Sequence, residues 1–169
     1  MKVLIHDLDS DVLNGLFPNI SKEVKIISPE KEIKKCIGCF GCWIKTPGYC
    51  VIKDGYENMG KLLSESEELI IISRVCYGGF SPFVKNVLDR SIGYLSPFFT
   101  VRNKEMHHKS RYKRKLKLSV IAYGKDATEK ERDNLSKIVA ANGVNFNAID
   151  HSFCFADNID DIPKLRGVL

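Results

Sequence analysis

The sequence predicts an α/β domain in which helices cover both faces of a parallel β-sheet. Short runs rich in valine and isoleucine alternate with longer segments of helical period, a pattern typical of parallel sheets with helical crossovers. The predicted strands are Lys2–His6, Val24–Ile27, Leu69–Ser73, Leu118–Tyr123 and Val144–Ile149. The third of them, LIIIS, is apolar without a break, which indicates burial on both faces.

The helices expected between these strands begin with recognisable signals. Ser81 and Pro82 suit the N-cap and the first helical position, and apolar residues then recur every three or four positions as far as Leu95. Thr128 and Glu131 have the spacing of a capping box. Shorter helices are expected over Asp9–Phe17 and from Tyr56 to about Ser66.

Length and composition indicate a single domain that spans residues 1–169. With 44% apolar and 28% charged residues, the chain is an ordinary globular protein. No apolar run approaches the roughly 20 residues of a membrane-spanning helix, and the N-terminus lacks the features of a signal peptide. We therefore expect a cytoplasmic protein without a membrane partner. Thiols stay reduced in that compartment, so clustered cysteines indicate metal or redox chemistry.

The positive charge of the chain is concentrated in one segment. Arg102–Lys117 contains eight Lys or Arg and one Glu, a net charge of +7 within a chain of net charge +5, so the remainder has a net charge of −2. Tyr112 is the one aromatic residue in the segment, which argues against a nucleic-acid interface. We expect a solvated loop, a contact for a partner subunit, or a clamp for the 2′-phosphate of NADPH.

Four cysteines lie close together in the run CIGCFGCWIKTPGYC. Their spacing allows the thiols to converge on one point, as an iron–sulfur cluster requires. A zinc site with four thiolates and a set of cysteines without metal are the alternatives. The candidate metal ligands are Cys36, Cys39, Cys42 and Cys50.

The motifs CIGCFGCW, TPGYCVIKD, SRVCYGGFSPFVKNVLDR and EMHH together resemble the flavodoxin-like NAD(P)H:FMN oxidoreductases, and more narrowly their iron–sulfur flavoprotein branch. The resemblance implies a three-layer flavodoxin-like fold with a five-stranded parallel sheet of order 2-1-3-4-5. It also implies FMN, NAD(P)H as electron donor, a [4Fe–4S] cluster on the four cysteines, and a small-molecule or protein electron acceptor. A homodimer or homotetramer is expected, and the aromatic stretch Tyr94–Phe99 could serve a subunit contact or end a helix.

The implied flavin site lies at the carboxyl ends of the first, third and fourth strands, where such sheets bind ligands. Gly78 and Gly79 would let the backbone approach a planar ligand, and Tyr77 offers an aromatic face. No catalytic acid or base is assigned, because the flavin carries the chemistry. The implied cofactor-binding residues are Ser10, Arg74, Val75, Cys76, Tyr77, Gly78, Gly79, Tyr123 and Gly124.

The loop after the first strand departs from the family pattern. Where the family has a Gly/Ser-rich phosphate loop, this chain has HDLDSDVL. Asp7, Asp9 and Asp11 would oppose a phosphate dianion by about a few kcal/mol if partly desolvated. This observation supports two alternatives: a non-enzymatic scaffold that acts as a metal-binding or interaction module, or a phosphate-free ligand such as riboflavin.

The histidines and Arg74 allow two interpretations each. His6 either faces the ligand edge or is a hydrogen-bonded residue near the surface. His107 and His108 either donate protons near neutral pH or lie in a surface or subunit-contact loop. Arg74 either approaches a cofactor or pairs with an acid at the rim.

We expect the cysteine-rich loop and the Tyr-Gly-Gly turn to meet across one crevice.

Overall fold

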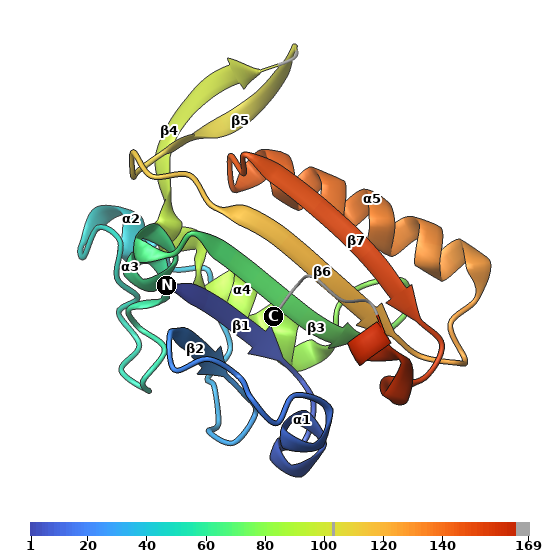
Figure 1. The fold of residues 1–169 in the computed structure, drawn as a ribbon. Coiled ribbons are helices and arrows are strands. Elements are labelled where there is room, and N and C mark those ends of the chain that lie inside the picture. The colour runs from blue at the N-terminus through green and yellow to red at the C-terminus, as the bar shows by residue number, and fades with distance from the viewer. Residues whose placement is uncertain (103, 165–169) are drawn as a thin grey trace.

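The computed structural model describes residues 1–102 and 104–164, and its centre is a five-stranded parallel sheet of order β2-β1-β3-β6-β7 (Figure 1). The strands are β1 (Lys2–His6), β2 (Val24–Ile27), β3 (Glu68–Arg74), β6 (Lys117–Tyr123) and β7 (Asp150–Ala156). β4 and β5 form a separate sheet. When the five strands of the main sheet are numbered consecutively, their order is the predicted 2-1-3-4-5. The predicted fold class is therefore confirmed.

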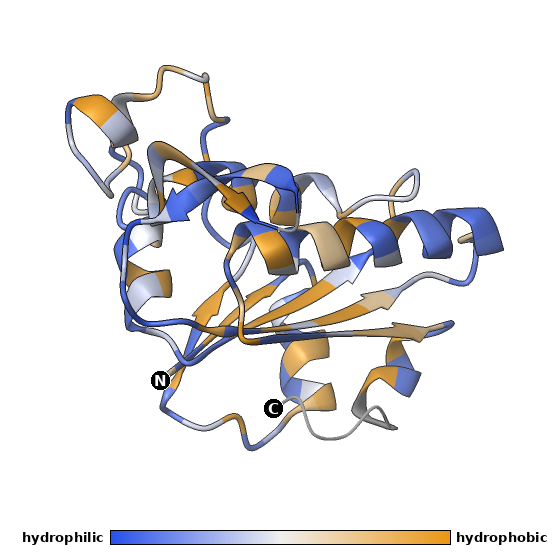
Figure 2. Cartoon of the chain, turned by 90° about the horizontal axis from the view of Figure 1, so that it is seen from above, coloured by the Kyte–Doolittle hydropathy of each residue, from blue (hydrophilic) through white to orange (hydrophobic). Residues whose placement is uncertain are grey.

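Helices lie on both faces of the sheet, as Figure 2 shows edge-on. α3, α4 and α5 pack on one face, whereas α1 and the 3₁₀ helix η2 pack on the other. The Ser81 side chain caps α4, and Thr128 with Glu131 forms a capping box on α5, so both predicted helix starts are confirmed. The helices are α1 (Ser10–Leu16), α2 (Gly41–Ile44), α3 (Met59–Glu65), α4 (Pro82–Arg90), η1 (Ile92–Tyr94), α5 (Glu129–Asn145) and η2 (Ile159–Lys164).

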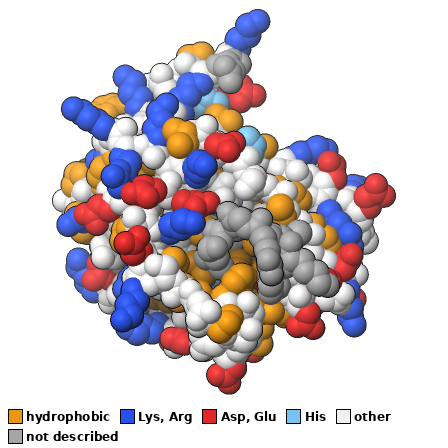
Figure 3. Space-filling model, in the orientation of Figure 1, with side chains coloured by type: hydrophobic (Ala, Val, Ile, Leu, Met, Phe, Trp, Pro, Cys, Tyr) orange, Lys and Arg blue, Asp and Glu red, His pale blue; other side chains and the backbone are white. Residues whose placement is uncertain are grey.

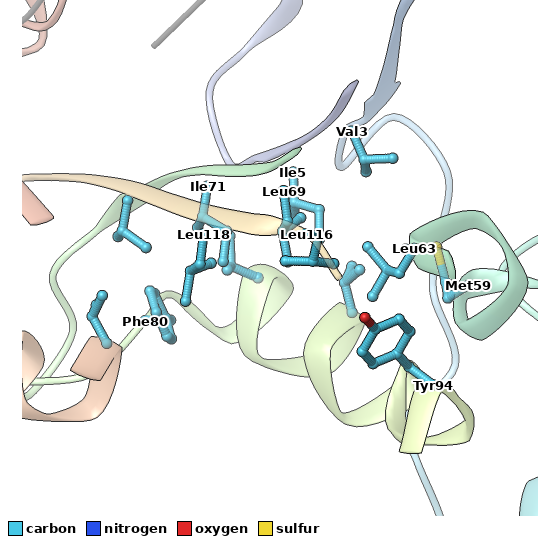
Figure 4. Packing of buried hydrophobic residues seen from close by; sticks show 14 of the residues in the cluster. Val3, Ile5, Met59, Leu63, Leu69, Ile71, Phe80, Tyr94, Leu116 and Leu118 are labelled. Carbon is cyan, nitrogen blue, oxygen red and sulfur yellow. The ribbon is translucent and has the colours of Figure 1, made fainter. Parts of the chain in front are cut away.

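The core is divided by the sheet according to the two-residue period of the strands. Leu69 and Ile71 face α3, α4 and α5 in the larger cluster (Figure 4), whereas Ile70 and Ile72 face the smaller cluster under α1. The central run of β3 is therefore buried on both faces, as its unbroken apolar sequence predicts. Among the described residues, no helix has the length and apolar character that crossing a membrane requires.

Two predicted boundaries are wrong. Val144–Ile149 is not a strand: α5 continues to Asn145, Asn147 has a φ of 52° at the chain reversal, and the last strand is Asp150–Ala156. The residues at the end of α5 could extend the helix or begin a strand. The helix continues because adding a residue to a helix that is already capped and hydrogen-bonded costs little. α4 also ends at Arg90 rather than at Leu95.

A β-hairpin follows η1 and was not predicted. β4 (Leu95–Arg102) pairs antiparallel with β5 (Glu105–Ser110), and the hairpin projects from the body of the molecule (Figure 1). Part of the basic segment Arg102–Lys117 therefore forms a strand, whereas residues 111–116 form a loop, as expected, in which Lys113, Arg114 and Lys115 are exposed. Figure 3 shows Lys and Arg side chains gathered over this part of the surface. The stretch Tyr94–Phe99 enters the hairpin, where Phe98 and Phe99 are exposed.

Candidate functional site

The ends of β1, β3 and β6 are joined by the carboxylate of Asp7. Its Oδ2 accepts a hydrogen bond from the backbone N–H of Arg74 (2.9 Å), and its Oδ1 accepts one from the Tyr123 hydroxyl (3.0 Å). Burial and the nearby Asp7 charge raise the pKa of Tyr123, so the phenol stays protonated and donates. The structure thus brings together Arg74 and Tyr123, two of the residues expected at the flavin.

A tight turn follows β3 at the same sheet edge. Cys76 and Gly79 exchange two backbone hydrogen bonds of 2.9 Å each. The φ values of 51° at Tyr77 and 72° at Gly78 are those of a type I′ turn. Asn134 on α5 donates from Nδ2 to the Gly78 carbonyl (2.8 Å). The turn is therefore fixed from two sides, while the Tyr77 side chain is 99% exposed and open to a ligand.

The other predicted flavin residues border this turn. Val75 donates its backbone N–H to the Tyr123 carbonyl (2.9 Å), and Gly124 has a φ of 145°, which glycine tolerates. The exposed Arg74 guanidinium lies 3.9 Å from the carboxylate of Asp126. Burial raises the pKa of the Cys76 thiol, which favours packing over nucleophilic chemistry.

The loop before α1 carries exposed carboxylates. Asp9 occupies the N-cap of α1 without a capping hydrogen bond from its side chain, and both Asp9 and Asp11 are exposed. The Ser10 hydroxyl donates to the carboxylate of Glu30. The negative charge of this loop would oppose a bound phosphate, as the sequence predicts.

His6 does not have the predicted surface environment. It is 0% exposed, and within the described ranges neither ring nitrogen has a hydrogen-bond partner. Burial lowers the pKa of His6, against the raising effect of the nearby Asp7 and Glu30 carboxylates. His6 is therefore a buried imidazole at the end of β1, and the expectation of a residue near the surface is wrong.

The four clustered cysteines line one cavity of about 270 Å³, together with Arg90 and Ile92. Cys36 and Cys39 are exposed and Cys42 is buried. The pKa of Cys42 is raised by burial and by the charges of the other three thiols, which places all four within electrostatic reach. In the described part of the chain, however, no three His, Cys, Asp or Glu side chains converge closely enough to hold a metal ion.

A buried ion pair fixes one wall of this cavity. Arg90 at the end of α4 donates from Nη1 and Nη2 to the two carboxylate oxygens of Asp54 (2.7 and 2.8 Å), and the side chains are 0% and 6% exposed. Hydrogen bonding from Arg90 lowers the pKa of Asp54 to about 2. Neither Arg90 nor Asp54 was predicted from the sequence as a site residue. The available signal was the position of Arg90, three residues after Val87 on the apolar face of α4.

The opposite side of the cysteine segment packs against glycines and aromatic rings. A Cβ on Gly60 would lie 2.7 Å from the Gly48 carbonyl oxygen, so α3 approaches the segment closely. Trp43 on α2 donates from Nε1 to the Ile92 carbonyl (3.1 Å), and its ring lies 4.7 Å from that of His108. The cysteine segment is thereby joined to both η1 and the hairpin.

The two histidines of the EMHH motif have structural contacts on β5. His108 packs between Trp43 and Phe99, with ring centroids 4.7 Å apart on each side. The Nδ1 atom of His107 lies 3.3 Å from the Asn145 side-chain oxygen on α5. These contacts attach the hairpin to α2 and α5, far from the turn that follows β3.

The predicted single crevice is wrong, because α4 separates the two groups of residues. The Tyr-Gly-Gly turn immediately precedes α4, whereas the cysteine cavity includes Arg90 at its other end. Nine helical residues span about 13 Å. Figure 1 shows α2 beside the amino-terminal ends of the strands, and Figure 4 places Phe80 and Tyr94 at opposite ends of the core cluster.

Comparison with curated proteins supports the resemblance drawn from the sequence. An iron–sulfur flavoprotein of Methanocaldococcus jannaschii is 39% identical over 83 residues, 48% of this chain and 42% of that protein. One of Archaeoglobus fulgidus is 33% identical over 70 residues, 41% of this chain and 31% of that protein. The chain therefore spans less than half the length of these relatives. No protein-family model matches the chain.

Solved structures share the fold over nearly the whole chain. An NAD(P)H:quinone oxidoreductase from Methanothermobacter marburgensis has a TM-score of 0.61 at 10% identity, covering 98% of this chain and 90% of that one. An FMN-dependent NADH-azoreductase from Bacillus anthracis, solved with FMN, has a TM-score of 0.55 at 9% identity, covering 98% and 93%. At these identities the likeness establishes the flavodoxin-like fold.

Proposed function

We propose, from the likeness to iron–sulfur flavoproteins and from the geometry of the sheet edge, that this chain is a flavin-dependent NAD(P)H oxidoreductase. The observation that carries the proposal is the fixed Cys76–Gly79 turn, which lies beside Tyr123 at the ends of β3 and β6. The turn exposes an aromatic side chain and open backbone at the position where sheets of this order bind ligands.

The residues at this edge would bind and orient the isoalloxazine ring of FMN. Tyr77 would offer its exposed ring for stacking, and Gly78 and Gly79 would admit the ring close to the backbone. Asn134 would keep the turn in place through its bond to Gly78. When bound, FMN would supply hydride and electron chemistry, with NAD(P)H as donor and a small molecule or redox protein as acceptor.

We further propose an iron–sulfur cluster in the cysteine cavity. The chemistry of the donors suits such a group, because four thiols line one cavity and a buried guanidinium lies in its wall, and binding would draw the thiols closer together than they lie here. Thiolates are the usual ligands of these clusters. The cluster would supply one-electron transfer, and Cys36, Cys39, Cys42 and Cys50 would hold it. A homodimer or homotetramer remains our expectation for the assembly.

The visible spectrum of protein purified without oxygen tests these proposals. The two-band absorbance of a bound oxidised flavin, restored by added FMN, would support the flavin site. Broad brown absorbance that dithionite bleaches would support the cluster, and Cys42→Ser with Cys50→Ser should remove it without removing the flavin bands. Colourless protein that takes up no FMN would contradict the oxidoreductase assignment.

A second function is favoured by the acidic loop. The Asp7 carboxylate already holds the Arg74 N–H and the Tyr123 hydroxyl, and Asp9 and Asp11 add exposed negative charge nearby. A scaffold that has lost its phosphate site and acts as a non-enzymatic module would have these features. Equal titrations with FMN and buffer alone, in protein with an intact thermal transition, would select this alternative.

A further inference from the structure

The most constrained charged group in the described residues is Arg90, which lines the cysteine cavity. Each terminal nitrogen of its guanidinium makes two hydrogen bonds. Nη1 donates to Asp54 and to the Lys34 carbonyl (2.8 Å), and Nη2 donates to Asp54 and to the Ile52 carbonyl (3.2 Å). A side chain with so many fixed partners has one orientation, so whatever it presents to the cavity is presented rigidly.

The remaining donor of this guanidinium has no such partner. Within the described ranges, Nε of Arg90 is buried and finds no hydrogen-bond partner. A buried N–H without a partner is costly and is usually explained by a ligand or a functional role. Cys50 lines the same cavity as Arg90 and lies within electrostatic reach of its guanidinium.

The charge expected at the cysteine site also favours a role for Arg90. A centre held by four thiolates is anionic, and burying uncompensated negative charge is expensive. Asp54 binds the two terminal nitrogens of Arg90, so the pair is a fixed dipole in the wall of the cavity that the four cysteines line. Partners of metal ligands that donate such hydrogen bonds orient the ligand and tune the metal.

We propose that Arg90, held by Asp54, is a positioning residue of the cysteine site: it orients the Cys50 sulfur and offsets the negative charge of a thiolate-bound metal centre. This inference rests on the proposed metal function of the cavity. It assigns a role to two residues outside the cysteine motif, and it predicts that the metal affinity and reduction potential of the site depend on them.

The test replaces both members of the pair, so that no buried charge is left alone. The Arg90→Gln, Asp54→Asn double variant keeps polar side chains at both positions and removes both charges, and with them the dipole. The control is Arg132→Gln with Asp157→Asn, a more exposed ion pair of 2.8 Å between α5 and the residue that follows β7. Apoprotein is titrated with Co²⁺ alone, and binding is followed by the sulfur-to-cobalt charge-transfer absorbance.

We expect the Arg90/Asp54 variant to bind Co²⁺ roughly 10- to 100-fold more weakly than the native chain, the usual effect of losing a partner of a metal ligand. The control should stay within about twofold. After reconstitution with iron and sulfide, the reduction potential should shift to more negative values only in the Arg90/Asp54 variant, because reduction adds negative charge beside the lost dipole. Equal Co²⁺ affinity and equal potential in a folded variant would overturn the inference.

A measurement on the native chain covers the case in which the double variant does not fold. The ¹⁵N–¹H resonance of Arg90 Nε is compared before and after addition of Cd²⁺ alone. A shift and slower solvent exchange on loading would support the hydrogen bond to the site, and an unchanged resonance in metal-loaded protein would overturn it. Absence of any thiolate–cobalt band in the native chain would instead overturn the metal site itself, and the role of Arg90 with it.

Discussion

The two ends of α4 carry two candidate sites that are built in different ways. At its amino-terminal end, the turn after β3 is held mainly by backbone hydrogen bonds and by the register of β3 with β6. At its carboxyl-terminal end, the irregular segment that carries the cysteines is held by side chains, above all by the pair of Arg90 and Asp54.

This difference decides how each site responds to substitution. The position of the turn after β3 is determined by the fold itself. Substituting a single side chain there should therefore affect ligand binding more than the folded structure. The cysteine cavity has no sheet or long helix of its own, since α2 has four residues. Losing one buried partner should therefore loosen the whole cysteine segment.

The largest change in unfolding free energy is expected when only one member of the buried ion pair is replaced. Arg90→Gln leaves the Asp54 carboxylate buried without its counter-charge, which should cost about 3 to 5 kcal/mol of unfolding free energy. The measurement is urea unfolding at neutral pH, followed by circular dichroism.

The matched comparison is the double variant with Asp54→Asn, which should recover much of this loss because no charge remains buried. Arg132→Gln at the surface pair should change the unfolding free energy by under about 1 kcal/mol. Equal losses in the Arg90 and Arg132 single variants would show that burial of the Arg90 pair contributes little.

Acid should weaken the same pair. The Asp54 pKa of about 2 lies below its ordinary value of 3.8, so its contribution is complete above about pH 4 and is lost as pH falls toward 2. The shift corresponds to about 2 kcal/mol. We expect the native chain to lose this much more unfolding free energy between pH 4 and pH 2 than the Arg90→Gln, Asp54→Asn variant, and parallel pH profiles would contradict the assignment.

Substitution at the contact between the cysteine segment and α3 should change the unfolding free energy by a smaller amount. At Gly60 the steric cost of a Cβ opposes the gain in helix propensity that alanine brings. A Cβ at Gly60 would lie 2.7 Å from the Gly48 carbonyl oxygen and 2.9 Å from Gly93. Gly60→Ala should therefore destabilise the chain by about 1 to 2 kcal/mol despite the better helix former.

Gly15 in α1 is the matched control for Gly60, since a Cβ there meets nothing within 4 Å. Gly15→Ala should be neutral or stabilising by up to about 1 kcal/mol. Thermal unfolding of the two single variants separates the cases, and a stabilised Gly60→Ala chain would show that the contact between α3 and the cysteine segment can relax.

The two ends of α4 differ in how well the sequence predicts them. The amino-terminal end, where the site depends on the sheet, is predicted much better than the carboxyl-terminal end, where it depends on side-chain contacts. Strand composition and the caps at Ser81 and Thr128 are local signals, and they correctly predict the parallel α/β class and both helix starts, whereas the strand order followed from the family resemblance. The partnership of Arg90 and Asp54 joins positions 36 residues apart across an irregular segment. No local pattern reports such a contact, so the separation of the two sites by α4 became visible only in three dimensions.

The hairpin and the last strand show a second limit of local reasoning. β4 and β5 carry charged and aromatic residues without a clean alternation, so their pairing depends on contacts such as that of His108 with Trp43. Val144–Ile149 has strand-like composition but lies at the end of α5 and in the turn after it. In both cases tertiary context overrides local propensity.

The smallest expected effect concerns the acidic loop at the sheet edge. Asp7 is fixed by hydrogen bonds from Arg74 and Tyr123, so the negative charges that can be removed without disturbing the ends of the strands are those of the exposed Asp9 and Asp11. Asp9→Ser with Asp11→Gly should tighten FMN binding by roughly threefold at low ionic strength and by less at high salt, because exposed charges are screened.

Riboflavin is the control for this titration, because it has the same ring system and no phosphate. Its affinity should be unchanged in the variant, which isolates the charge of the loop from any change in the turn. An equal gain for both ligands would mean that the aspartates act by shaping the loop. No gain for either would remove electrostatic repulsion as the reason for the unusual sequence after β1, and the tied carboxylate of Asp7 would then be the stronger determinant of which flavin this edge accepts.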